Sequence, residues 1–204
     1  MKGALWHGRP YALPDLPKGA KVLELGCGNG KNLLEMARRG WDVMGIDVSQ
    51  EAVRLAKDAL AQLGISEVGS GKSEVLIADA ATLPFGGSEF DAVFAFHIFD
   101  HALENARKRM AVEALRVLKI GGALHFRGFS TGDMRFSADE KQVERNTFRR
   151  ESGILYHYFE APEVEALFCG AGFAMKEIKT ESWQVRIANG KFKREEIVGF
   201  FRKP

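Results

Sequence analysis

The sequence has little cysteine, no long hydrophobic run and no excess of charge of one sign. Its two cysteines, Cys27 and Cys169, lie far apart without a C-x-x-C pair, which argues against a disulfide framework and a structural zinc site. No stretch approaches the roughly 18 apolar residues of a membrane span, and residues 1–17 lack the apolar core of a signal peptide. We therefore expect a cytoplasmic protein with no membrane span.

The charge and composition also restrict the partners. The net charge is +2, and lysine and arginine alternate with aspartate and glutamate, which does not favour nucleic acid as a partner. Apolar residues make up 46% of the chain and charged residues 27%, close to the averages of soluble globular proteins. We expect a single domain over 1–204, with an N-terminal segment at 1–20, an insertion or lid at about 131–159, and a monomer or homodimer.

Short apolar runs rich in β-formers alternate with segments of helical periodicity, which is typical of a sheet built from βαβ units. A pair of strands, 173–188 and 191–202, follows at the C-terminal end, and the Asn189-Gly190 signal between them predicts an antiparallel hairpin at the edge of the sheet. Residues 131–159 are longer than a routine loop and are expected to be irregular. The earlier strands are expected at 21–25, 42–46, 74–78, 90–96 and 123–129, and the helices at about 31–39, 49–63, 103–118 and 162–169.

A glycine-rich turn, Glu24-Leu-Gly-Cys-Gly-Asn-Gly30, joins the first of these strands to the first helix. Glycines let the backbone turn tightly and let a ligand approach the main-chain N–H groups at a helix N-terminus. The spacing differs from the G-x-G-x-x-G of a dinucleotide fold, and no G-K-[ST] follows as in a nucleotide-binding Walker loop. A nucleotide-dependent oxidoreductase is therefore disfavoured.

Two carboxylates follow the next two strands. Asp47 ends the second strand, about 20 residues beyond the glycines, where an acidic side chain can accept hydrogen bonds from ribose hydroxyls. Asp79 follows the third strand, where a carboxylate can accept a proton from an exocyclic adenine amino group. Together they point to a nucleoside ligand. A tight turn at the glycines, a helix cap at Asp47 and a turn at Asp79 are the purely structural alternatives.

With these motifs the sequence resembles the class I S-adenosylmethionine-dependent methyltransferases. The resemblance rests on VLELGCGNG at 22–30, GIDVS at 45–49, ADAATLPF…FDAVFAF at 78–96 and LRVLKIGGALHF at 115–126. It implies an α/β, Rossmann-like three-layer sandwich, with a mostly parallel seven-stranded sheet of order 3-2-1-4-5-7-6 and strand 7 antiparallel. It also implies S-adenosyl-L-methionine as cofactor and S-adenosyl-L-homocysteine as product.

The resemblance also assigns residues to the cofactor. It places Glu24 and glycines 26, 28 and 30 at the methionine end, Asp47 at the ribose, and Asp79 with Ala80 at the adenine. N-terminal segments of related enzymes often fold over the cofactor, so Trp6 is expected either to stack there or to pack elsewhere. The remaining expected cofactor contacts are Cys27, Asn29, Val48 and Phe96.

The methyl-accepting side carries no comparable signature. The N-P-P-[YF] tetrapeptide of many amino-nitrogen methyltransferases is replaced by Phe-His-Ile-Phe at 96–99, which counts against adenine or glutamine amide as acceptor. His97, Asp100 and His101 lie at the same sheet edge. The two histidines are candidates for a general base or a substrate hydrogen bond, or are polar lip residues. A metal pair lacks an evident third ligand, so no metal is expected.

Further polar residues are expected to converge over the same pocket. Arg127 ends the fifth strand, and arginine suits a carboxylate or phosphate. Arg127 and the polar residues of the insertion are each equally compatible with a role at the surface or in packing. The catalytic candidates are His97, His101, Arg127, Tyr156 and His157, and the insertion also contributes Asp133, Arg135 and Tyr158.

The sequence thus predicts methyl transfer to a small-molecule acceptor. Displacement at a sulfonium needs mainly positioning, with a base only where the acceptor must lose a proton. A non-catalytic S-adenosylmethionine-binding scaffold or regulatory subunit is the alternative, because catalytic residues are not diagnostic in this fold.

Overall fold

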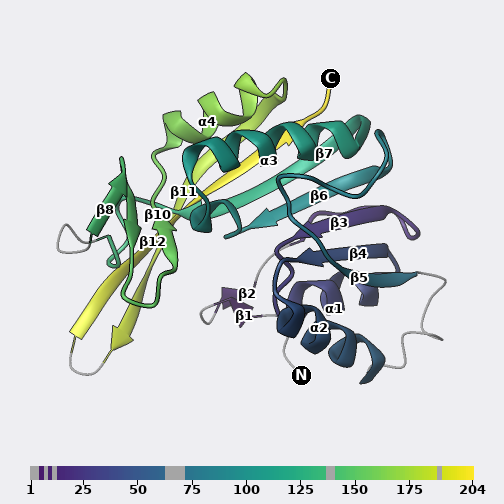
Figure 1. Ribbon diagram of the computed structural model, residues 1–204, viewed down its shortest axis with the longest axis horizontal. Helices are drawn as coiled ribbons and strands as arrows, with labels where there is room; N and C mark the ends of the chain where they lie inside the picture. The colour runs from purple at the N-terminus through teal and green to yellow at the C-terminus, as the bar shows by residue number, and fades with distance from the viewer. Residues whose placement is uncertain (1–4, 7–8, 11–12, 63–71, 137–140, 188–189) are drawn as a thin grey trace.

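A seven-stranded sheet forms the centre of the computed structural model, which describes residues 5–6, 9–10, 13–62, 72–136, 141–187 and 190–204 (Figure 1). The strands lie in the order β5-β4-β3-β6-β7-β12-β11. Numbered along the chain among themselves, this order is 3-2-1-4-5-7-6, so the expected topology is confirmed. The strands are β3 (Lys21–Leu25), β4 (Asp42–Asp47), β5 (Ser73–Ile77), β6 (Phe90–Phe96), β7 (Leu118–Phe129), β11 (Ala174–Ile187) and β12 (Gly190–Arg202).

The first five of these strands run parallel, and β12 pairs antiparallel with both β7 and β11. The chain leaves β3 for β4 on one side and later returns to β6 on the other. The carboxyl ends of β3, β4 and β6 therefore meet where the direction of winding reverses, which is where open α/β sheets bind their ligands.

Helices cover both faces of the sheet. α1 (Lys31–Arg38) and α2 (Gln50–Gln62) lie on one face, and α3 (Glu104–Val117) and α4 (Ala161–Gly170) lie on the other (Figure 1). Successive strand residues point to opposite faces, so Val22 packs with the α1 and α2 side chains and Leu23 with those of α3 and α4. Burial of each large apolar side chain contributes roughly 1.5–3 kcal/mol to folding stability. These two cores therefore hold the sheet, and with it the strand ends, in place.

Local signals in the sequence explain how the elements begin. Ser49 Oγ accepts a hydrogen bond from Ala52 N at 3.2 Å, so Ser49 caps the N-terminus of α2. β7 begins at Leu118, earlier than expected, because Leu118 pairs with Phe90 before the register shifts at Gly121 and Gly122. The C-terminal hairpin is confirmed. Ile187 pairs with Gly190, so the connection falls at residues 188 and 189, and Asn189 lies outside the described residues.

The insertion is more regular than expected. It contains a three-stranded antiparallel sheet of β8 (Lys141–Glu144), β9 (Thr147–Arg149) and β10 (Leu155–His157), which lies beside the long hairpin (Figure 1). The expectation of an irregular segment was wrong because Phe148 and Tyr158 bury their rings against Phe129. That small core stabilises strands of three or four residues, which are too short to show a periodic pattern.

A short ribbon precedes the sheet, formed by β1 (Leu5–Trp6) and β2 (Arg9–Pro10). The side chain of Trp6 lies outside the described residues, so its expected contact with the cofactor stays a prediction. Among the described helices, none combines the length and the apolar character needed to cross a membrane.

Candidate functional site

A cleft of about 340 Å³ opens at the carboxyl ends of the parallel strands. Gly26 follows β3, Asp47 ends β4, Asp79 follows β5 and Ile98 follows β6, and all four line it. Val48 and Ala80 line it as well. The structure therefore brings residues from three of the quoted motifs into one cleft.

The glycine turn is shaped for close approach. Gly26 has φ +68°, and a Cβ there would lie 2.7 Å from Ile98 Cδ1. Gly30 caps α1 at φ +79°, and its Cβ would lie 3.0 Å from Ala56 Cα. Side chains are thus excluded at both positions, at the first by the cleft wall and at the second by α2.

The Asp47 carboxylate holds two loops together at the cleft. Its Oδ2 accepts from Gly28 N and its Oδ1 from Ser49 N, both at 2.9 Å. The helix-cap role given as the alternative for Asp47 falls to Ser49 instead, whose Oγ accepts from Ala52 N in the first turn of α2. A carboxylate offers about four lone-pair directions, so two amide bonds leave acceptor capacity on each oxygen for a ligand in the cleft.

Asp79 and Val48 provide the next part of the cleft. Asp79 Oδ1 accepts from Ala81 N at 2.8 Å, a turn contact, while the residue remains exposed along the cleft. Val48 is 68% exposed although it is apolar. An exposed apolar side chain next to an acceptor is suited to a flat ring that carries an amino group.

Glu24 is buried behind the glycine turn. Asn32 Nδ2 donates to its Oε1 at 2.7 Å, and Oε2 has no hydrogen-bond partner in the described part of the chain. Burial raises the pKa of Glu24 to about 8, against the lowering effect of the Asn32 bond, and the nearby Asp47 adds to the rise. A buried acceptor without a partner costs about 1–3 kcal/mol, so this oxygen favours a ligand with a cationic donor.

Among the described residues, three further expected cofactor contacts do not line the cleft. Cys27 is buried, and burial raises the pKa of its thiol to about 12, so it remains a protonated packing group. Asn29 is exposed in the glycine turn. Phe96 packs edge-on against Phe94, with ring centroids 5.6 Å apart.

His97 lies buried at the end of β6 in a left-handed backbone conformation, with φ +58°. Its Nδ1 is 2.7 Å from Asp100 Oδ2, its Nε2 is 3.5 Å from Glu196 Oε1, and its ring lies 4.4 Å from that of Phe129. Burial lowers the pKa of His97 to about 3 and raises that of Asp100 to about 7. His97 is therefore a neutral imidazole held among carboxyl groups.

His101 is placed differently, because it is exposed and lines the cleft. Its Nδ1 is 2.8 Å from the carbonyl oxygen of Leu155, and the ring of Tyr156 meets it edge-on at 5.0 Å. A carbonyl oxygen only accepts, so Nδ1 carries the proton and Nε2 of the neutral ring keeps a lone pair. The two histidines thus have separate partners, and no metal-binding group of three His, Cys, Asp or Glu occurs among the described residues.

Two of the catalytic candidates serve the packing instead. Arg127 pairs with Glu196 at 2.8 Å and with Glu181 at 2.9 Å. His157 is 1% exposed, with Nδ1 2.8 Å from Thr147 Oγ1 and Nε2 2.9 Å from Glu163 Oε1. Neither lines the cleft.

The insertion residues gather around Phe129. The Arg135 guanidinium lies 3.8 Å from the centre of the Phe129 ring, and Tyr156 stacks beside that ring at 6.2 Å. Asp133 binds both Arg135 and Arg194, while the Tyr158 hydroxyl donates to the Arg135 carbonyl oxygen at 2.8 Å. Arg135 and Tyr156 therefore flank the ring on which His97 packs.

The sequence motifs missed one part of the cleft, which comes from α3 and the turn before it. Leu103, Ala106, Arg109 and Met110 all line it. Their spacing on the helix was the only available signal, and it does not distinguish a cleft wall from ordinary packing.

The comparisons with known proteins agree with this geometry. A family model described as a methyltransferase domain matches residues 22–122. A solved structure of an S-adenosylmethionine-dependent methyltransferase from Methanosarcina mazei has a TM-score of 0.80 at 27% identity, covering 92% of this chain and 94% of that one. The chain belongs to the class I S-adenosylmethionine-dependent methyltransferases. S-adenosylmethionine is thus its cofactor.

Two relatives show how broad this methyltransferase family is. One, from Arabidopsis thaliana, is a tRNA (carboxymethyluridine(34)-5-O)-methyltransferase that is 32% identical over 120 residues, covering 58% of this chain and 26% of that protein. The other, methyltransferase GfsG of Streptomyces halstedii, is 33% identical over 115 residues, covering 56% and 39%. The matched region spans well under half the length of either relative.

Proposed function

We propose that this protein transfers the methyl group of S-adenosylmethionine to a small-molecule acceptor bound beside His101. The observation that carries the proposal is the single cleft lined by Gly26, Asp47 and Asp79, which come from three successive strand ends. S-adenosylmethionine supplies an electrophilic methyl group when it is bound.

Residues that line the cleft, and Glu24 buried behind it, fit the parts of that cofactor. Asp47 has spare acceptor capacity for the ribose hydroxyls, and Asp79 with the apolar Val48 suits an adenine ring and its amino group. Glu24 Oε2, buried without a partner in the described chain, suits the cationic amino group of the methionine moiety. The charged Glu24 is the form that such a cation favours.

His101 is the residue best placed to accept a proton from the acceptor. The bond from its Nδ1 to Leu155 leaves Nε2 as the basic nitrogen, and the residue lies at the cleft. His97, buried against Asp100, holds the neighbouring wall instead. A positioned base contributes roughly 10²–10⁴-fold to a reaction that requires proton removal.

A small molecule is supported as the acceptor by the charge of the chain. A net charge of +2 with mixed signs provides little attraction for a polyphosphate backbone. The apolar residues Leu103 and Met110 line the cleft together with Arg109, and this lining suits a compact ligand with apolar surface and an anionic or polar group.

Calorimetric titration with S-adenosylmethionine tests the cofactor step. The wild-type protein is expected to bind in the micromolar range, and Asp47→Ala is expected to lose the binding. Asp58→Ala, which removes an exposed partner of Arg54 on α2, is the matched control and should bind like wild type. A folded wild-type sample that binds no cofactor would contradict the proposal.

Transfer of a radiolabelled methyl group to a panel of small-molecule acceptors and to total tRNA tests the catalytic step. Label in a small molecule supports the proposal. Label in tRNA alone would replace the proposed acceptor class. Cofactor binding without transfer to any acceptor would favour the non-catalytic scaffold.

A further inference from the structure

One wall of the cleft comes from the 3₁₀ helix η1 (Phe99–His101) and the first turns of α3. His101, Leu103 and Ala106 line the cleft from this segment, and none of them belongs to the strand-end motifs. The position of this wall therefore depends on how α3 begins.

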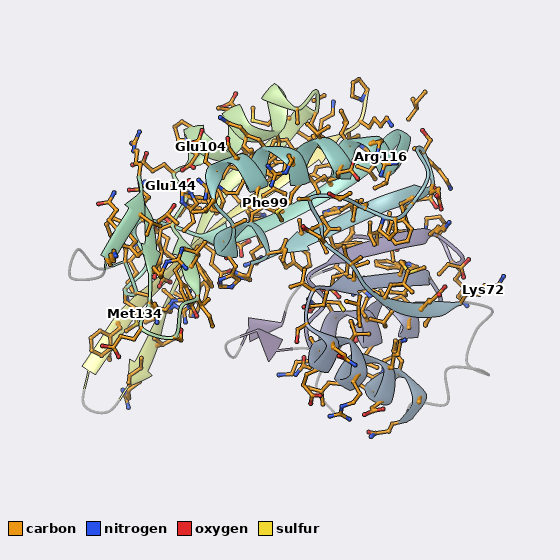
Figure 2. All side chains as sticks on the ribbon, in the orientation of Figure 1. Lys72, Phe99, Glu104, Arg116, Met134 and Glu144 are labelled. Atoms are coloured by element: carbon orange, nitrogen blue, oxygen red, sulfur yellow. The ribbon has the colours of Figure 1, made fainter. Side chains whose placement is uncertain are left out.

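α3 does not cap itself. Leu103 occupies its N-cap position, and a leucine side chain has no acceptor for the free amides of the first turn. The amide of Glu104 instead donates to Glu144 Oε2 at 2.9 Å. Glu144 ends β8, in the insertion, and Figure 2 shows its label beside that of Glu104 where the small sheet meets the helix. A carboxylate is favoured there by the helix dipole as well.

Arg107 connects the same carboxylate to the cleft lining. Its side chain is buried, and its Nη1 donates to the carbonyl oxygen of Ala102, a lining residue, at 2.6 Å. Its Nη2 lies 3.7 Å from Glu144 Oε2 and 3.8 Å from Glu163 Oε1. A buried guanidinium needs nearby carboxylates. Glu144 therefore also stabilises the wall through Arg107, in addition to capping α3.

The insertion also contacts the other end of the wall. Leu155 in β10 accepts from His101 Nδ1, and Tyr156 packs edge-on against the His101 ring. The small sheet thus contacts both ends of the segment 101–107, although no residue of β8, β9 or β10 lines the cleft.

We propose that Glu144 is a positioning residue for cofactor binding, and that docking of the small sheet and occupancy of the cofactor cleft are coupled. The inference rests on the proposed function, since the coupled ligand is the cofactor. With the sheet docked, the Glu144 carboxylate caps α3 and the wall is held in its binding position. By linkage, a ligand that requires this wall stabilises the docked sheet to the same extent.

The test compares three variants by calorimetric titration with S-adenosylhomocysteine. Glu144→Ala removes the cap and should raise Kd by about three- to ten-fold, the size expected from loss of one helix cap. Glu144→Gln keeps an acceptor oxygen without the charge, so its Kd should lie between those of wild type and the alanine variant. Glu151→Ala, an exposed residue between β9 and β10, is the control and should match wild type.

Two further measurements separate positioning from general stability. In steady-state assays, the KM for the cofactor should rise more than kcat falls in Glu144→Ala. In wild type, the amides of residues 141–144, 147–149 and 155–157 should exchange more slowly with solvent when S-adenosylhomocysteine is bound.

The outcomes distinguish the two proposals. Absence of binding to wild type defeats the proposed function. If wild type and Glu144→Ala bind S-adenosylhomocysteine equally, the positioning role of Glu144 is overturned while the proposed function stands. If the alanine variant does not fold, hydrogen exchange on wild type decides, and unchanged protection of the small sheet overturns the coupling.

Discussion

The cofactor side and the acceptor side of the sheet edge are held by different kinds of contact. On the cofactor side, Asp47 and Asp79 bind backbone amides of their own and adjacent turns. On the acceptor side, side chains reach partners far along the chain, as in His101 with Leu155, 54 residues away, and Arg127 with Glu196, 69 residues away. The cofactor side is thus formed by backbone geometry, and the acceptor side by packing between side chains that are distant in sequence.

This difference predicts that the two halves respond differently to substitution. Changes at the cofactor side should act first on cofactor affinity, because they alter the shape or charge of the cleft. Changes at the acceptor side should alter turnover where the side chain reaches the cleft, and only folding stability where it does not, except at Glu144, which acts on cofactor affinity through the α3 wall.

The largest expected effect is on turnover at His101. His101→Ala removes the nitrogen placed to accept a proton, and kcat should fall by about 10²-fold or more. The comparison is His157→Gln, a histidine with both nitrogens engaged in packing, which should lower the free energy of unfolding by about 1–3 kcal/mol with kcat little changed. Kinetics at saturating cofactor, together with denaturant unfolding, check both. Equal kcat values in the two variants would contradict the division.

A smaller effect is expected from crowding in the glycine turn. Gly26→Ala places a Cβ 2.7 Å from Ile98 in a left-handed conformation, whereas Gly28→Ala, also left-handed, has nothing within 4 Å. The strain of about 1–2 kcal/mol is common to both, so the clash should add at least several-fold to the Kd for S-adenosylhomocysteine only at Gly26. Calorimetry on the two variants measures the difference in Kd. Equal losses of affinity in both would show that the space between Gly26 and Ile98 does not affect cofactor binding.

The smallest expected effect is the pH dependence that Glu24 contributes. Its folded pKa of about 8 exceeds the usual 4.5, so between those values the folded state binds more protons than the unfolded state. Stability from this group is therefore present at low pH and is lost as pH rises from about 5 to 8. Relative to Glu24→Gln, wild type should lose at least about 1 kcal/mol over that range. Parallel pH profiles for the two proteins would contradict a buried protonated Glu24.

The fold could be predicted from the sequence because its signals are local and repeated. The strand order followed from the resemblance, and the C-terminal hairpin from the turn signal at Asn189-Gly190 between two expected strands. Asp47 and Asp79 lie in one cleft because parallel strands end at the same edge. These features depend on neighbours within a few residues or on the topology itself.

The rest could not be predicted because it depends on distant partners. The strands of the small sheet are stabilised by packing of Phe148 and Tyr158 on Phe129, which no short window reveals. The placement of His157 is fixed by Glu163 across the start of α4, and the carboxylate that caps α3 comes from β8. Sequence patterns identify such residues as polar without identifying what they bind.

The most direct test of the central claim is a crystal structure of the protein with S-adenosylhomocysteine. The ligand should lie in the cleft with its ribose hydroxyls on the Asp47 carboxylate and its adenine beside Asp79 and Val48. A ligand bound elsewhere, with Asp47 and Asp79 contacting only their own turns, would contradict the account.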